Sequence, residues 1–170
     1  LDAGISERTL IPEVIYDMCD YEQLLNDADM IGHQVIEKNF KSHAKGLCKG
    51  SKIGIKKDMT NTEKACVLAE EIGHYHTTVG NILNQENASQ RKQEKIARKW
   101  AVNRMLKIED LFDAVLDGCQ TLYDVAEYLG VTEIFLYDAI AVFKQKYGLY
   151  YQRNGKRLVF TDCGFYLDKL

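Results

Sequence analysis

The chain has 170 residues, of which 46% are hydrophobic and 28% charged, as in globular domains that bury a core. Its net charge of −3 argues against a protein whose main work is to coat nucleic acid, because such proteins are usually strongly basic. Five cysteines without a C-x-x-C pair and a single proline argue against a disulfide framework, a zinc ribbon and a Pro-rich linker. The composition therefore predicts a soluble, cytoplasmic protein with reduced thiols.

Targeting and membrane segments are not expected either. The first ten residues alternate apolar with polar side chains and contain no apolar core of a signal peptide. The longest apolar stretch, residues 134–143, is interrupted by Asp138 and is too short to span a bilayer. We therefore expect no contact with a membrane.

The first part of the chain has the pattern of a mixed α and β structure. Apolar residues spaced by three and four predict a helix over residues 12–31. A short strand is expected at 34–37 and a hairpin at 45–55, which turns at Gly50. Thr60 and Glu63 have the spacing of a capping box, so a second helix begins at Thr60 or the next residue.

The second part of the chain is predicted to be mainly helical. A polar loop at 84–91 is followed by a helix at 92–106 and by three shorter helices at 108–117, 122–129 and 132–146. Asn154-Gly155 predicts a hairpin within residues 149–160. In the helix at 92–106 the residues expected to face inward are Ile96, Ala97, Trp100, Ala101 and Met105.

A candidate catalytic motif lies in the second helix. Glu70 and His74 are four residues apart, so both side chains lie on one helix face within reach of a single ion. Glu71 is rotated from them and can address a water molecule beside that ion. This is the H-E-x-x-H geometry of zinc peptidases with a glutamate in place of the first histidine. Since carboxylate oxygen is an acceptable zinc ligand, the motif predicts a more anionic zinc site.

Two other interpretations of these residues remain open. Glutamates and a histidine on an amphipathic helix often form only a solvated edge. Glu71 and His74 also have the E-x-x-H spacing of di-iron carboxylate bundles, which need a second copy of the motif. The chain contains no second copy, so that interpretation requires two subunits to share the site.

A family resemblance supports the metal interpretation. Residues 63–78 resemble the active-site helix of ImmA/IrrE-type metallopeptidases, which occur in phages and mobile elements. Residues 94–101, with Glu94, Ala97 and the pair Trp100-Ala101, resemble the second helix of that family. The strands expected before the motif helix also match the layout of the family. The resemblance covers residues from about 30 to 147.

The resemblance implies a role for each of these residues. Glu70, His74 and Glu94 would be the ligands of one divalent ion, with zinc the first choice, and Glu71 would be the general base of peptide hydrolysis. His76 is expected beside the ligands rather than among them. The extra carboxylate would reduce the Lewis acidity of zinc and favour harder ions. The alternative for Glu94 is an ordinary surface residue in a cationic helix.

Residues 121–136 resemble a helix-turn-helix, in which Gly130 would make the turn and Thr132 would cap the second helix. Between residues 121 and 147, however, four acidic residues outnumber two lysines. DNA readers need cations on this helix, so we expect a packing unit or a protein-docking surface and no DNA binding. The cations gather instead on the helix that contains Glu94, namely Arg91, Lys92, Lys95, Arg98, Lys99, Arg104 and Lys107.

These expectations combine into one prediction of fold class. It is an α+β protein with a zincin-like helix pair and a small antiparallel sheet, followed by a helix-turn-helix-like segment and a C-terminal β-hairpin. The domain boundaries would be 1–107 for the metallopeptidase-like domain, 108–147 for the helical segment and 148–170 for the hairpin.

The predicted function is that of a zinc-dependent metallopeptidase of a phage or mobile element, which acts on a helix-turn-helix repressor. The alternative is a catalytically inactive anti-repressor or toxin–antitoxin-like module that retains the fold. A third interpretation is a transcription factor that works through residues 121–147.

Overall fold

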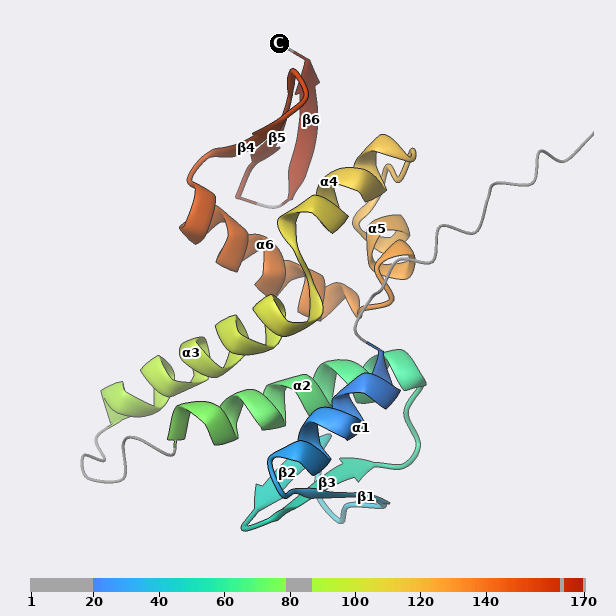
Figure 1. Cartoon of the computed structure of the whole chain (residues 1–170), viewed down its shortest axis with the longest axis vertical. Helices are drawn as coiled ribbons and strands as arrows, with labels where there is room; N and C mark the ends of the chain where they lie inside the picture. The colour runs from blue at the N-terminus through green and yellow to red at the C-terminus, as the bar shows by residue number, and fades with distance from the viewer. Residues whose placement is uncertain (1–19, 79–86, 163, 170) are drawn as a thin grey trace, which may run out of the picture.

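The computed structural model describes residues 20–78, 87–162 and 164–169. Within them the chain forms six helices and two three-stranded sheets, which confirms the α+β class (Figure 1). The first sheet lies at one end of the molecule with the helices α1, Tyr21–Met30, and α2, Asn61–Thr78, and the second sheet lies at the other end (Figure 1). The helix α3, Asn87–Met105, runs from the first part toward the second (Figure 1).

The first sheet follows α1 and has the strand order β1-β3-β2. β2 and β3 form the predicted hairpin, which turns at Gly50 with a φ of 58°. β1 pairs with the other edge of β3 and runs parallel to it, so the sheet is mixed. The prediction of an antiparallel sheet was therefore wrong for β1, whose pairing is not fixed by a tight turn. The bounds are α1 Tyr21–Met30, β1 Gln34–Lys38, β2 Gly46–Lys49 and β3 Lys52–Lys56.

The first helix starts later than the apolar pattern predicted. Asp20 has extended backbone angles and accepts a hydrogen bond from the Gln23 N–H at 2.9 Å, so it is the N-cap of α1. The predicted positions before residue 20 lie outside the described residues. Within α1, Leu24 and Ala28 are buried against the core as expected.

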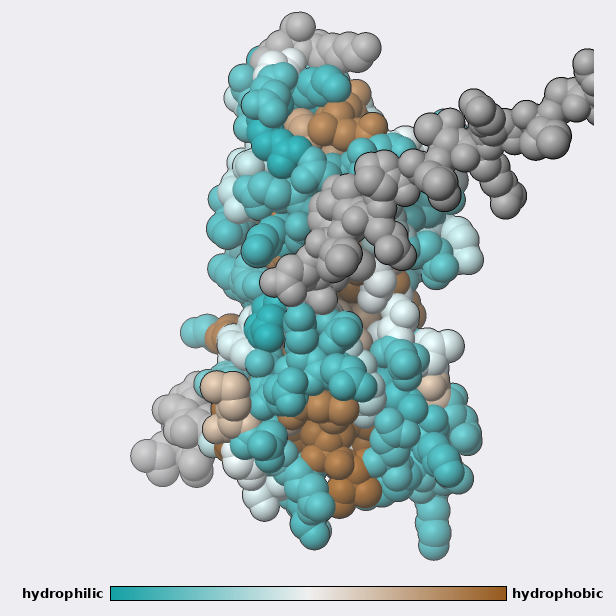
Figure 2. Space-filling view, turned by 45° about the vertical axis from the view of Figure 1, so that its right-hand side comes forward, coloured by the Kyte–Doolittle hydropathy of each residue, from teal (hydrophilic) through white to brown (hydrophobic). Residues whose placement is uncertain are grey.

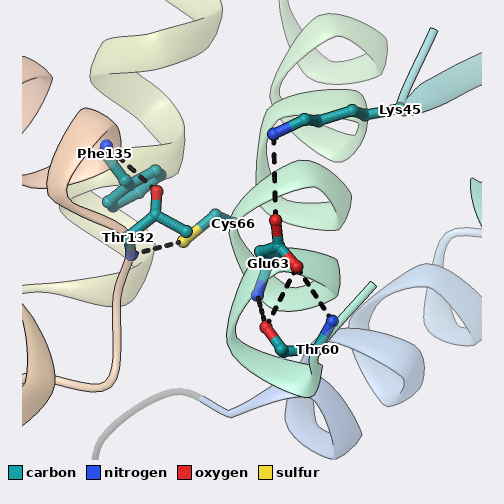
Figure 3. Close-up of polar contacts among 6 residues, drawn as sticks. All are labelled: Lys45, Thr60, Glu63, Cys66, Thr132 and Phe135. Carbon is teal, nitrogen blue, oxygen red and sulfur yellow. Dashed lines mark hydrogen bonds and ion pairs between the residues drawn. The ribbon is translucent and has the colours of Figure 1, made fainter. Parts of the chain in front are cut away.

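The long helices α2, Asn61–Thr78, and α3, Asn87–Met105, pack against each other. The predicted capping box is confirmed, because the Thr60 N–H donates to the Glu63 carboxylate at 2.9 Å and the Glu63 N–H donates to the Thr60 hydroxyl at 3.2 Å (Figure 3).

Two predictions about α3 need correction. The helix already includes residues 87–91, which were expected to belong to a loop, while residues 84–86 lie outside the described part. Ile96, expected to face inward, is 44% exposed. Ala97 and Ala101 are buried as predicted, and they define the face of α3 that contacts the core.

Three shorter helices connect the two ends of the molecule. Gly130 has a φ of 59° at the turn before α6, and the Thr132 hydroxyl accepts the Phe135 N–H at 3.2 Å, so both local predictions are confirmed. The buried Cys66 thiol of α2 accepts the Thr132 N–H at 3.5 Å and links α2 to the start of α6 (Figure 3). The bounds are α4 Ile108–Leu116, α5 Leu122–Tyr128 and α6 Glu133–Tyr147.

The second sheet contains the predicted hairpin and one further strand. Asn154 and Gly155 both have positive φ, 51° and 72°, as a tight hairpin turn requires. The strand β6 then pairs antiparallel with β5, so the C-terminal segment is a three-stranded sheet rather than the predicted hairpin. The bounds are β4 Tyr150–Arg153, β5 Lys156–Phe160 and β6 Phe165–Lys169.

A hydrophobic core runs through both parts of the molecule, from Leu24 in α1 to Phe160 in β5. The Arg104 guanidinium of α3 donates two hydrogen bonds to Asp27 of α1, at 2.6 and 3.1 Å. The face that Figure 2 shows is mostly hydrophilic, with one apolar patch in its lower half and another near its top. Across the described ranges, no helix is both long and apolar enough to cross a bilayer.

Candidate functional site

Glu71 lies in the middle of α2, where this helix crosses the edge strand β2. A Cβ atom added to Gly46 would lie 2.6 Å from the Glu71 Oε1 atom, so a larger residue there would displace this carboxylate. The backbone of Cys48, two residues further along β2, also forms a hydrogen bond with Glu71. The strand therefore fixes the position of the carboxylate.

The surroundings of Glu71 favour its protonated form. Burial raises its pKa to about 7, and the negative charges of Glu70 and Glu94 add to this effect. The hydrogen bond from Cys48 acts in the opposite direction, because it stabilises the carboxylate. A carboxyl group with a pKa near neutrality can both accept and release a proton, which is what general acid–base catalysis requires.

His74 and Glu94 face each other across the pair of long helices. The His74 Nε2 atom of α2 lies 3.6 Å from the Glu94 Oε2 atom of α3. Both side chains reach solvent, with 33% of His74 and 53% of Glu94 exposed. The structure therefore brings two of the three predicted ligands together, although they are 20 residues apart in the sequence.

Glu70 lies among charges from α3 and α6. Burial raises its pKa, and the nearby carboxylates of Asp138 and Glu94 raise it further. The guanidinium of Arg98 lowers it and also forms an ion pair with Asp138 at 3.5 Å. The charge of Glu94 therefore affects the pKa of Glu70, and the guanidinium of Arg98 offsets part of the negative charge of Glu70.

The imidazole of His76 stacks on the indole of Trp100. The ring centroids are 4.7 Å apart and the planes are inclined by 28°. His76 therefore adds a contact between α2 and α3 two residues from His74 along the chain. The sequence had placed it beside the ligands, and its role in metal binding stays a prediction.

The donor atoms have the right chemistry for a divalent cation. Two ligands bound to tetrahedral zinc at 2.0–2.1 Å lie about 3.3 Å apart, and the 3.6 Å between His74 and Glu94 is close to this separation. In the part of the chain that the structure describes, however, no three His, Cys, Asp or Glu side chains form a group that could hold a metal ion. The pair thus fits an ion, while Glu70 does not complete a three-residue group.

Three residues around the site were not predicted from the sequence. Gly46 leaves space for Glu71, and Arg98 with Asp138 places opposite charges beside Glu70. Arg98 was noted only as one member of a cationic helix, and Asp138 was named as the residue that interrupts the apolar stretch 134–143. Their contact depends on the packing of α3 against α6, for which the sequence contains no local signal.

A comparison with protein families bears directly on these residues. The model of the Peptidase M78 family, described as the IrrE N-terminal-like domain, matches residues 28–140. The chain belongs to the Peptidase M78 family. This membership confirms the resemblance to ImmA/IrrE-type metallopeptidases that the motif helix indicated. No curated protein and no solved structure matches the chain significantly.

The Peptidase M78 match spans both long helices. It therefore includes Glu70, Glu71, His74 and Glu94, as well as α5 and the first half of α6. Membership of the Peptidase M78 family supports a metallopeptidase-family protein, while the roles of Glu70, Glu71, His74 and Glu94 stay predictions.

Proposed function

We propose that the chain is a metal-dependent endopeptidase with its active site between α2 and α3. The observation that carries the proposal is the 3.6 Å approach of His74 and Glu94, at the spacing of two metal ligands. Glu71 lies within one turn of His74 on the same helix. Membership of the Peptidase M78 family supports the same chemistry.

In this proposal His74 and Glu94 would hold one divalent cation, and the sequence-based prediction assigns Glu70 as its third ligand. The cation would polarise the scissile carbonyl and lower the pKa of a water molecule. Glu71 would accept a proton from that water as the water oxygen adds to the carbonyl carbon, and would pass the proton to the amine that leaves when the C–N bond breaks. Gly46 and the Cys48 backbone hold the Glu71 carboxylate in place during this transfer. Zinc is the first candidate, and the two carboxylate ligands extend the choice to harder ions.

The experiment measures metal content and cleavage separately. Protein purified without added metal, then titrated with zinc, should bind about one ion per chain. His74→Ala and Glu94→Ala should each lose the ion, whereas Glu71→Gln should keep it and lose hydrolysis. Cleavage is measured with a diverse peptide library, read by mass spectrometry for new N-termini.

Two exposed residues supply matched controls. His43→Ala and Glu127→Ala remove the same side-chain types from exposed positions outside the proposed ligands and general base. Both variants should bind zinc and hydrolyse peptides like the unmodified protein. Equal hydrolysis by Glu71→Gln and the unmodified protein would overturn the proposal.

The substrate that we propose is a helix-turn-helix repressor of a phage or mobile element. This part of the proposal rests on the family analogy. Between α5 and α6, Gly130 makes the turn, and Thr132 caps α6. The acidic surroundings of α6 favour a protein contact over a DNA contact for this segment. Purified repressor, incubated with zinc-loaded protein, should be cut only when Glu71 is intact.

The second candidate function is a binding module without catalysis, such as an anti-repressor. It is favoured by the lack of a three-residue metal group among the described residues and by the cation, Arg98, beside Glu70. This alternative predicts that the protein takes up no zinc, even in excess metal. It also predicts that repressor binding survives in His74→Ala and Glu94→Ala.

A further inference from the structure

A groove separate from the candidate active site lies between the C-terminal ends of α3 and α6 and the start of α4. Its volume is about 430 Å³, which is within the range of small-ligand pockets. Lys99, Lys107 and Lys146 line its rim and come from three different segments of the chain. All three side chains are exposed, and none forms an ion pair within the described residues.

The floor of this groove is apolar. Leu106, Ile108 and Phe143 line it and are almost fully buried, and Tyr147 forms part of the wall. The Lys146 ammonium lies 5.0 Å from the centroid of the Tyr147 ring, so the cation and the aromatic surface adjoin each other. A ligand that fits must combine negative charges with an apolar group.

The carboxylates near the groove offset only part of the charge of its three lysines. Glu109 also lines the groove, and its carboxylate accepts a hydrogen bond from the Tyr151 hydroxyl at 2.8 Å. The Asp110 carboxylate accepts a hydrogen bond from the backbone N–H of Lys107 at 2.7 Å. This N–H at the start of α4 therefore already has a partner within the protein. The attraction for an anion therefore comes from the three ammonium groups, not from the helix end.

We infer that this groove binds an acidic peptide segment of a partner protein, with an apolar side chain on the floor and carboxylates against the lysines. Charge complementarity selects acidic residues, and the buried floor selects a leucine-like or phenylalanine-like side chain between them. A nucleic acid is disfavoured, because the protein as a whole has a net charge of −3, whereas nucleic-acid-binding proteins are usually strongly basic.

The groove and the candidate active site share α3. Asn103 lines the groove and is nine residues from Glu94, which corresponds to about 13 Å along a helix. An extended peptide covers that distance with about four residues. If the proposed function holds, an acidic segment in the groove would hold a substrate near the active site. The binding itself does not depend on catalysis.

The test is a titration of the metal-free full chain with a fluorescein-labelled peptide that has glutamates on both sides of one phenylalanine. Fluorescence anisotropy should show binding that weakens as salt rises. The triple variant Lys99→Gln, Lys107→Gln, Lys146→Gln should bind the peptide about tenfold or more weakly. Replacing the phenylalanine of the peptide by serine should weaken binding as well.

A second triple variant keeps the test specific. Lys41→Gln, Lys49→Gln and Lys52→Gln remove the same charge from exposed positions at the first sheet, and this variant should bind like the unmodified protein. Equal losses in the two triple variants would overturn the inference, because only the overall charge would then matter. Tighter binding of a single-stranded thymidine oligonucleotide than of the peptide would overturn it too. Zinc binding and hydrolysis are measured in separate experiments. A failure of the peptide titration would therefore not count against the proposed function.

Discussion

A Cβ atom on Gly73 would lie 2.5 Å from the carbonyl oxygen of Ala97, so α2 and α3 approach each other at backbone distance. This close approach allows side chains on both helices to meet one residue further along α2. There His74 reaches Glu94. The candidate metal site therefore depends on a glycine that contributes no chemical group of its own.

Gly73→Ala should destabilise the protein, although alanine normally improves a helix by about 1 kcal/mol relative to glycine. The added methyl group meets backbone atoms, which cannot rotate away, and overpacking of this kind costs about 1–3 kcal/mol. Urea unfolding followed by circular dichroism measures the difference. The control is Gly164→Ala, whose Cβ meets no heavy atom within 4 Å. A Gly73→Ala variant that is more stable than the unmodified protein would contradict the packing described.

Gly46→Ala should affect activity more than stability. Its Cβ would meet the side chains of Glu71 and Val67 at 2.6 Å, and side chains can move where backbone cannot. Moving the Glu71 carboxylate by about an ångström lowers kcat/KM by up to about a hundredfold. Zinc content should stay unchanged, because Glu71 is not a proposed ligand. Unchanged hydrolysis with the same stability would show that this contact does not position the general base.

The pKa of Glu71 makes the stability of the metal-free protein depend on pH. Because its pKa is raised to about 7 in the folded state, the folded protein binds this proton more tightly than the unfolded chain does. The resulting stabilisation is fully present below the unfolded pKa, near 4.5, and is lost as the pH rises through about 7.

Glu71→Gln removes that titration. In the presence of a chelator, the Tm of the variant should fall less between pH 5 and pH 8 than the Tm of the unmodified protein. Thermal melts recorded at steps of about one pH unit measure the difference. Glu127→Gln is the control, since this glutamate is exposed on α5. Parallel Tm profiles for Glu71→Gln and the unmodified protein would contradict the raised pKa.

The contact between Arg104 and Asp27 should contribute about 1 kcal/mol of coupling energy, because it has two hydrogen bonds and partly excludes water. A double-mutant cycle with Arg104→Ala and Asp27→Ala measures it. The pair of Arg98 and Asp138 is the comparison, since its single contact is longer, at 3.5 Å, and its arginine is more exposed. Its coupling should be smaller, and the reverse order would contradict the geometry.

The sequence predicted those features that depend on neighbours along the chain. Thr60 and Glu63 form the expected capping box, and Asn154-Gly155 makes the expected turn, because both signals act over three or four residues. The spacing of Glu70 and His74 likewise follows from helix geometry alone. Local signals of this kind predict helices, turns and candidate motifs without knowledge of the tertiary packing.

Features that depend on packing between distant segments were missed or wrongly predicted. The parallel pairing of β1 with β3 has no turn to define it, and β6 joins the second sheet through long-range pairing only. Ile96 has the spacing of a buried residue but remains 44% exposed, because the contact face of α3 is centred on Ala97 and Ala101. The charges of Arg98 and Asp138 meet beside Glu70 for the same reason: the packing of α3 and α6 brings them there.

The position of α2 between other elements has a genetic consequence. It contacts α1, α3, β2 and β3, and Cys66 joins it to the start of α6. In a random-mutagenesis selection for loss of function, most inactive alleles in this helix should therefore yield little intact protein in the cell. The exceptions should be alleles at Glu71 and His74, which accumulate to normal levels while the phenotype is lost. Immunoblotting of such alleles would separate the residues that build the fold from those that act on the substrate.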